Sequence, residues 1–319
     1  MDHKLKKEIG KIEKLKKNKK FECLFPHCSN LSIGSHSQQR GGQLKVISRN
    51  DEVYAMNFNM YEVLTKGESA FSLIKTRIKN ASIYPGFCQN HDGQVFAPVE
   101  KRPLQFGDSL QAATLFLRTI TYEVTRKKLV HFKTQKIIEN CSKLLPEEVL
   151  KHFKLQNLGR KKFIENDLPF YLDRAYSVYN SPDSGIIKTK WVVIDKVIKA
   201  SSCTVFSPMR DANERFHHQA MACPQVMSTF NLIPTDNETH VVVSWLAEHH
   251  DDNEWIDGVM DTELEKFINY VAICESEDIC LGPDLWDSID IFTRERVHEA
   301  IHHELHRGPL DEIPNVIKI

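Results

Sequence analysis

Residues 23–28 read Cys-Leu-Phe-Pro-His-Cys, and residues 86–92 read Gly-Phe-Cys-Gln-Asn-His-Asp. A structural zinc site needs four thiolate or imidazole ligands, which commonly arrive as two pairs whose members are separated by two to four residues. Cys-x4-Cys and Cys-x2-His both meet this requirement. The sequence therefore predicts that the N-terminal segment folds around one structural Zn2+ ion, with Cys23, Cys28, Cys88 and His91 as its ligands.

Two nearby histidines leave alternatives for the ligand set. His27 could replace a cysteine, although its neighbours Pro26 and Cys28 favour a side chain that points away, and His36 could complete the site if Cys28 does not. The chain has eight cysteines, and the five outside the cluster are expected to be small buried hydrophobes, because a reducing cytosol disfavours disulfides. The alternative is that the three N-terminal cysteines are buried and unrelated to one another.

The ligand pairs and the loop between them resemble a treble clef. Because Ser35-His36-Ser37 lies between the pairs, the segment is also similar to the HNH, or ββα-metal, nuclease family. This resemblance implies a purely structural zinc ion, His36 as a general base acting on water, and a divalent metal such as Mg2+ nearby. The chain departs from the family at Ser35, which cannot supply the carboxylate that commonly precedes the base. No second histidine follows the second zinc pair within the next helix, so Asp92 is the nearby candidate ligand for Mg2+.

A longer pattern extends over more of the chain. Besides the two ligand pairs, it comprises Ser-His-Ser-x-Gln-Arg-Gly-Gly-x-Leu at 35–44, Val53-Tyr54, Ala81-Ser82, and residues 118–123 and 275–286. These segments look like a widespread set of bacterial proteins of unassigned function. Zinc proteins of this kind suggest antiviral defence or mobile elements, and that suggestion is an association only.

We predict an α+β fold with an N-terminal zinc-bound treble clef, a helical connector and a C-terminal mixed α+β domain. The predicted segments are a basic amphipathic helix (1–20), a zinc-binding HNH-like domain (21–104), a helical connector (105–180) and the C-terminal domain (186–319). Within them, the patterns predict a β-hairpin from 44–48 and 52–58, a loop or weak helix over 60–80, helices over 108–143, 146–166, 262–274 and 293–306, and strands over 190–198, 203–206, 227–233 and 240–246.

The composition is that of an ordinary soluble globular protein: 319 residues, 41% of them hydrophobic and 27% charged. The length suggests two or three domains. No apolar run approaches the ~18–20 residues that span a bilayer, and the N-terminus lacks the apolar region of a secretory signal. We therefore expect a cytoplasmic protein that does not interact with membranes.

The formal net charge of -1 hides a basic N-terminus. Residues 1–20 carry nine lysines against three acidic residues, so the rest of the chain is about -7 and should not attract nucleic acid in general. Apolar residues at helical spacing predict an amphipathic helix over 3–20 that packs one thin stripe onto the body. A phosphate-binding arm and a membrane-surface helix are the alternatives. The candidate nucleic-acid contacts are Lys14, Lys16, Lys17, Lys19 and Lys20.

A second motif near the C-terminus matches His-Glu-x-x-His, the zinc-binding helix of many metalloproteases, at His298, Glu299 and His302. Little chain remains for a downstream glutamate ligand, and the flanking residues are strongly charged. We therefore interpret this motif as part of a solvated helical face.

The leading functional hypothesis is an HNH-like, metal-dependent nuclease or a degenerate descendant of one. In it, His36 activates water, Asp92 helps to hold Mg2+, and the basic helix contacts DNA or RNA. The rival hypothesis is a non-catalytic zinc module in a binding or sensor protein, whose C-terminal domain recognises a protein partner. A zinc protease is the third.

Overall fold

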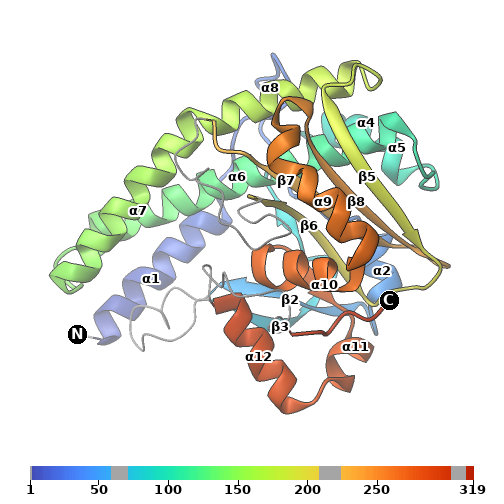
Figure 1. Cartoon of the computed structure of the whole chain (residues 1–319). Helices are drawn as coiled ribbons and strands as arrows, with labels where there is room; N and C mark the ends of the chain where they lie inside the picture. Colours follow the sequence, from blue (N-terminus) through green and yellow to red (C-terminus); the bar gives the residue numbers. More distant parts are fainter. Residues whose placement is uncertain (1, 59–70, 208–223, 303–313) are drawn as a thin grey trace.

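The computed structural model describes residues 2–58, 71–207, 224–302 and 314–319. It is a mixed α+β structure with one seven-stranded sheet, in the strand order β3-β2-β9-β6-β7-β8-β5 (Figure 1). Neighbouring strands are antiparallel throughout this sheet. The strands are β2 (Glu52–Phe58), β3 (Phe71–Arg77), β5 (Ile187–Ile194), β6 (Ala200–Phe206), β7 (Ser228–Pro234), β8 (Thr239–Leu246) and β9 (Ile279–Leu281).

Both faces of this sheet are buried because its central strands carry apolar residues on both sides. In β8, Val241, Val243 and Trp245 belong to one apolar core, while Val242 and Leu246 belong to the other. This is the alternation that a strand covered on two sides requires. The first core is closed by α9 (His250–Thr262), α10 (Leu264–Asn269), the π-helix η3 (Tyr270–Glu275) and α12 (Ile291–His302), and the second by α6 (Ser109–Cys141) and α8 (Asp167–Asn180).

Helix α6 runs through the centre of the molecule. It begins where the Asp108 carboxylate accepts a hydrogen bond from the Gln111 backbone N–H at 2.8 Å, which is a standard N-cap. Residues 111–125 are all buried, so this half of the helix has no solvent-facing side. The second half is more exposed and extends away from the sheet (Figure 1). The helix predicted over 108–143 is confirmed.

The second half of α6 packs with α1 (Asp2–Lys17) and α7 (Glu147–Glu165) beyond the sheet (Figure 1). Helix α1 buries Leu5, Ile9 and Ile12 in a cluster that also contains Ile137 of α6. Leu15, the next apolar residue at helical spacing, is 50% exposed. The amphipathic helix predicted over 3–20 is therefore confirmed up to Lys17, and its buried stripe ends at Ile12.

The hairpin predicted from 44–48 and 52–58 is wrong. Residues Gln43–Ile47 form the short helix α2, because Leu44 and Ile47 are three positions apart and bury one helical face. The observed hairpin is β2 with β3, in which Ala55 pairs with Ile74. The prediction of a loop or weak helix over 60–80 is therefore wrong for 71–77, while residues 59–70 lie outside the described part of the chain.

Segments from both ends of the chain share the seven-stranded sheet. Strands β2 and β3 belong to the predicted segment 21–104, and β9 belongs to segment 186–319. Strand β9 joins β2 to β6, with Ala55 and Ser201 both paired to Cys280. The turn at 180–185 therefore does not separate one sheet from another.

The remaining elements are short, and several of them surround the predicted metal ligands. They are β1 (Ser35–His36), β4 (Ile83–Tyr84), α4 (Gln89–Val95), α5 (Ala97–Glu100), the 3-10 helix η2 (Ala247–His249) and α11 (Pro283–Ser288). Strands β1 and β4 form a separate two-stranded sheet. Within the described ranges, no helix is both long and apolar enough to span a membrane.

Candidate metal centre

The first predicted ligand pair lies in the loop between α1 and β1. The Cys23 backbone N–H donates to the Asn30 carbonyl at 2.8 Å, and the Cys28 N–H donates to the Phe25 carbonyl at 3.1 Å. These bonds hold a tight turn around the two thiols. His27 has a left-handed backbone conformation with φ 61° and is exposed, so it lies outside the cluster.

The second pair lies where β4 leads into α4. Cys88 is the N-cap residue of this helix, and His91 is in its first turn. A three-residue spacing places the two side chains on one side of the helix. The Leu24 backbone N–H donates to the Gly86 carbonyl at 2.9 Å, which ties the first ligand loop to the segment that carries the second pair.

The structure brings the four predicted ligands into one cluster. Cys23 Sγ and Cys88 Sγ each lie 3.4 Å from His91 Nδ1, and Cys28 Sγ lies 4.0 Å from Cys88 Sγ. All four ligand atoms lie within 4.8 Å of one another. A tetrahedral ion with bonds of ~2.3 Å to sulfur and ~2.0 Å to nitrogen separates its ligand atoms by about 3.5–3.8 Å. The cluster could therefore hold a metal ion, and its dimensions are consistent with Zn2+.

The surroundings of the cluster shift the pKa values of the Cys88 and Cys23 thiols in opposite directions. The backbone N–H of His91 lowers the pKa of the Cys88 thiol, whereas burial raises the pKa of the Cys23 thiol to about 11. The Cys88 N–H donates to Cys23 Sγ at 3.2 Å, and the Phe25 ring stacks on His91 with centroids 4.0 Å apart. Metals bind the thiolate, so a divalent cation would supply the positive charge that the buried Cys23 sulfur lacks.

His36, the predicted general base, lies outside this cluster in β1. Its Nδ1 lies 3.0 Å from the Ala81 carbonyl oxygen. A carbonyl only accepts, so Nδ1 carries the proton of the neutral ring and Nε2 keeps its lone pair. Burial lowers the pKa of His36, and the charges of Arg40 and Arg118 act in the same direction. The neutral form of the ring is therefore favoured.

Asp92, the predicted ligand for a second metal, follows His91 on α4. Its negative charge raises the pKa of His36 against the stronger effect of burial, so the carboxylate and the ring interact electrostatically. Asp92 Oδ1 is buried and has no hydrogen-bond partner among the described residues. A buried carboxylate oxygen without a partner is unfavourable until a cation or a donor approaches it.

The sequence did not indicate the partly buried ion pair between Arg118 and Glu100, whose arginine acts on His36. Arg118 of α6 is 2% exposed, and its Nη2 donates to Glu100 Oε1 at 2.5 Å. Its guanidinium carbon lies 4.2 Å from the centroid of the Phe96 ring. A signal for this pair exists in the sequence, because Arg118 interrupts the apolar stretch of a predicted buried helix, where a charge needs a partner.

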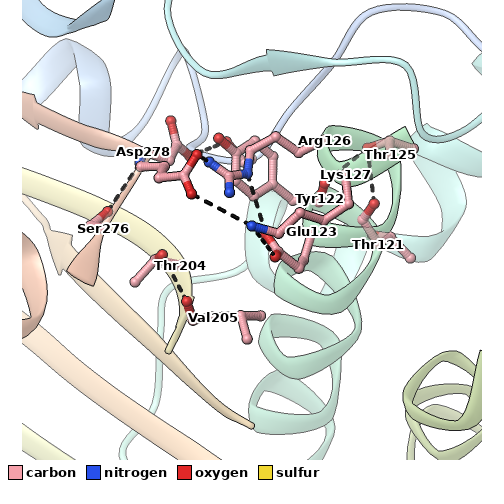
Figure 2. A network of polar contacts seen from close by, with 12 residues as sticks. Thr121, Tyr122, Glu123, Thr125, Arg126, Lys127, Thr204, Val205, Ser276 and Asp278 are labelled. Atoms are coloured by element: carbon pink, nitrogen blue, oxygen red, sulfur yellow. Dashed lines mark hydrogen bonds and ion pairs between the residues drawn. The ribbon is translucent and has the colours of Figure 1, made fainter. Parts of the chain in front are cut away.

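A second polar group that the sequence did not indicate connects the β1 region to β9. Asp278 is 6% exposed, and it accepts a hydrogen bond from Ser37 Oγ at 2.5 Å. Gln38 Nε2 donates to the Asp278 carbonyl at 2.7 Å. Figure 2 shows Asp278 next to Ser276 and opposite the turn of α6 that carries Tyr122. Burial raises the pKa of the Asp278 carboxyl to about 6.

The protease-like motif is only partly described. His298 is half-buried in α12 with its ring 5.7 Å from that of Trp286, and Glu299 is exposed. The side chain of His302 lies outside the described part of the chain. Among the described residues, His298 joins no group of potential metal ligands. The predicted solvated face is wrong for His298, which is half-buried, because neighbouring residues of α12 pack against the core.

The lysines proposed for nucleic-acid contact lie at and after the end of α1. Lys14 and Lys20 are exposed, while Lys16 and Lys19 are half-buried. Lys19 Nζ lies 5.3 Å from the centroid of the Phe132 ring, so it already has a cation–π partner. The side chain of Lys17 is not described.

Comparison with protein-family models, with curated proteins and with solved structures gave no match. The function proposed below is inferred from the geometry and chemistry of the residues at the candidate site.

Proposed function

We propose that residues 21–104 contain a treble-clef module around a structural Zn2+ ion, and that this module carries the general base of an HNH-like, metal-dependent nuclease. The four-membered cluster supports the zinc part of the proposal. Four protein ligands complete a tetrahedron, so they leave no open position for water or substrate. The zinc ion would hold the 23–28 loop against α4, and the chemistry would belong to neighbouring side chains.

The order of the elements supports the treble-clef assignment. A loop with the first ligand pair precedes β1, and β4 leads into α4 with the second pair. Strands β1 and β4 pair with each other, as the two strands of a ββα unit would. The elements α2, β2 and β3 are an insertion between them.

The observation that carries the nuclease proposal is the contact between His36 Nδ1 and the Ala81 carbonyl. This contact makes Nε2 the basic nitrogen of the ring. In the proposed reaction, Nε2 takes a proton from water while the oxygen of that water bonds to the phosphorus of a phosphodiester. The bond from phosphorus to the leaving sugar oxygen breaks, and that oxygen takes up a proton from solvent.

Asp92 supports a role for a divalent cation, because its buried Oδ1 lacks a partner among the described residues. Mg2+ is commonly bound by one or two carboxylates together with waters and substrate phosphates. A single carboxylate beside His36 is compatible with that pattern. When bound, the cation would neutralise negative charge on the phosphodiester.

The exposed lysines at the end of α1 support nucleic acid as the substrate. Lys14 lies on the helical face opposite the buried Leu5, Ile9 and Ile12, and Lys20 follows the end of the helix; both side chains are exposed and so are available to phosphates. Binding through lysine and phosphate alone is independent of sequence and depends strongly on salt. DNA and RNA are therefore both substrates to test.

The alternative proposal is a non-catalytic zinc module in a binding or sensor protein. It is favoured by two adjacent apolar residues at the start of α12, Ile291 and Phe292, which are 67% and 75% exposed. Neighbouring exposed apolar side chains are typical of a site that contacts another protein. In that case residues 186–319 would recognise the partner.

Cleavage assays separate the two proposals. The purified chain would be incubated with Mg2+ and labelled single-stranded DNA, double-stranded DNA or RNA, alongside His36→Ala and the control His152→Ala, which changes an exposed histidine of α7. We expect the wild type and His152→Ala to cleave at least one substrate, and His36→Ala to lose at least ~100-fold in rate. Cleavage that survives in His36→Ala would refute the role of His36.

A further inference from the structure

A pocket of about 180 Å³ lies between the turn before α2, the segment joining α5 to α6, and the end of β7. None of the residues predicted from the sequence as metal ligands, general base or nucleic-acid contacts lines it. We propose that this pocket binds a phosphate monoester of a ring compound, which is the chemistry of a single nucleotide. Arg118 and Arg102 would hold the phosphate, and an apolar wall would hold the ring.

Arg118 is the first observation for this site. It lines the pocket and is 2% exposed, so its guanidinium is held in a region of low polarity. Glu100 accepts a hydrogen bond from Nη2 alone, and Glu100 does not line the pocket. Arg118 Nε is buried and has no hydrogen-bond partner within the described ranges. The guanidinium therefore keeps donor capacity that its ion pair does not use.

The Arg118 guanidinium is also held in one orientation before any ligand binds. The guanidinium carbon lies 4.2 Å from the centroid of the Phe96 ring, and that contact together with the Glu100 ion pair restricts the side chain. A planar guanidinium held in one orientation suits oxyanions, because it offers parallel N–H donors at little further entropic cost.

Arg102 supplies a second positive charge to the same pocket. Its side chain is 51% exposed, and its Nη2 lies 3.9 Å from Asp108, which is too long for a hydrogen bond. Two guanidinium groups from different elements suit a dianionic phosphate monoester better than a monoanionic carboxylate. Asp236 also lines the pocket and opposes an anion, so its removal should strengthen binding.

The ring part of the proposal comes from the apolar residues of the pocket lining. Val99, Leu115 and Ile233 are buried residues that line it, and together with Val46 and Leu104 they form an apolar wall. A cavity of about 150 Å³ accommodates a benzene ring. The pocket therefore has room for about one small ring, so the remaining parts of a nucleotide would extend out of it. Its lining combines apolar side chains with a few charged and polar groups, as small-molecule sites do.

This site is tested by measuring binding rather than cleavage, so the result of the experiment does not depend on the nuclease proposal. Isothermal titration calorimetry would measure AMP, adenosine and inorganic phosphate on the full chain, and a phosphorylated dinucleotide would distinguish a strand end from a free nucleotide. We expect AMP or the phosphorylated dinucleotide to bind at least tenfold more tightly than adenosine or inorganic phosphate. The tighter of the two phosphorylated ligands identifies the source of the phosphate.

Variants of exposed residues keep the test free of folding defects. Arg102→Gln should weaken AMP binding about tenfold, Asp236→Asn should strengthen it about two- to threefold, and Lys101→Gln, a neighbouring exposed cation that does not line the pocket, should leave it unchanged. Adenosine or phosphate binding as tightly as AMP would overturn the proposal. An Arg102→Gln variant with unchanged affinity for AMP would overturn it as well.

Discussion

Replacing Asp278 with asparagine should stabilise the folded protein at neutral pH and give little stabilisation in acid. Burial raises the pKa of this carboxyl from 3.8 to about 6. Above that pKa the folded protein holds a buried carboxylate, which water solvates better in the unfolded chain. Asparagine has nearly the same shape, and its carbonyl oxygen can accept the hydrogen bond that Ser37 Oγ now donates to the carboxylate. The substitution therefore removes the charge and keeps the contact.

The sign and size of the effect follow from proton linkage. The pKa of Asp278 is higher in the folded state than in the unfolded state, so the folded protein binds more protons between the two values. Its contribution to the free energy of unfolding is present in acid and is lost as the pH rises towards about 6. At about 1.4 kcal/mol per pKa unit, the difference between 3.8 and about 6 corresponds to about 3 kcal/mol, as an upper value.

Urea denaturation of wild type and Asp278→Asn at about pH 4, pH 6 and pH 8 measures this difference. The advantage of the variant should grow by about 2–3 kcal/mol from the lowest to the highest pH. Asp195→Asn, which changes an exposed carboxylate, should differ from wild type by no more than about 0.5 kcal/mol at every pH. A stability difference for Asp278→Asn that is constant with pH, or largest in acid, would contradict the account of a buried carboxylate.

Three further perturbations probe the metal cluster, the core and the basic helix. Cys88→Ala should lose about one equivalent of bound zinc by atomic emission, whereas Cys274→Ala, outside the cluster, should keep it; equal zinc in both would refute the ligand assignment. Gly282→Ala should lower the free energy of unfolding by about 1–3 kcal/mol, because the added Cβ would lie 2.5 Å from the carbonyl oxygen of the last residue of α2. Gly159→Ala meets no atom within 4 Å in α7 and should raise that free energy by about 0.5–1 kcal/mol, so equal effects in a urea titration would contradict the packing argument. Lys14→Gln should reduce the slope of log affinity against log salt for double-stranded DNA by about 0.9, and an unchanged slope would show that this lysine contacts no phosphate.

Patterns within a few residues predicted much of this structure. The strands predicted over 227–233 and 240–246 correspond to β7 and β8, because runs of β-branched and aromatic residues suit a strand that is buried on both faces. The two ligand pairs were also visible, because each spans one turn of chain. That the two pairs lie close together could be predicted because a tetrahedral ion needs four ligands and each pair supplies two.

Contacts between distant segments could not be predicted in the same way. Strand β9 is an interior strand, third in the seven-stranded order. It has only three residues, so it is too short to show any periodicity. Its pairing with β2 joins residues 55 and 280, and nothing local to either position indicates the other. The partnership of Arg118 with Glu100 was missed for the same reason, because it depends on how α5 turns back against α6.

The sequence predicted a boundary at residue 104 between a zinc module and the rest of the chain. The packing shows no such boundary, because one apolar cluster contains residues from both sides of it. Cys23, Cys88 and Phe96 belong to the same apolar cluster as Phe116 of α6 and Val242 of β8. A small metal module normally depends on its ion because it has too little apolar surface to form a core. Here the central helix and the sheet supply that surface, so folding of this segment would not depend on a bound ion alone. Helix α6 contributes to all three sites: its Phe116 packs in the cluster with Cys23 and Cys88, and its Arg118 lines the pocket and lowers the pKa of His36.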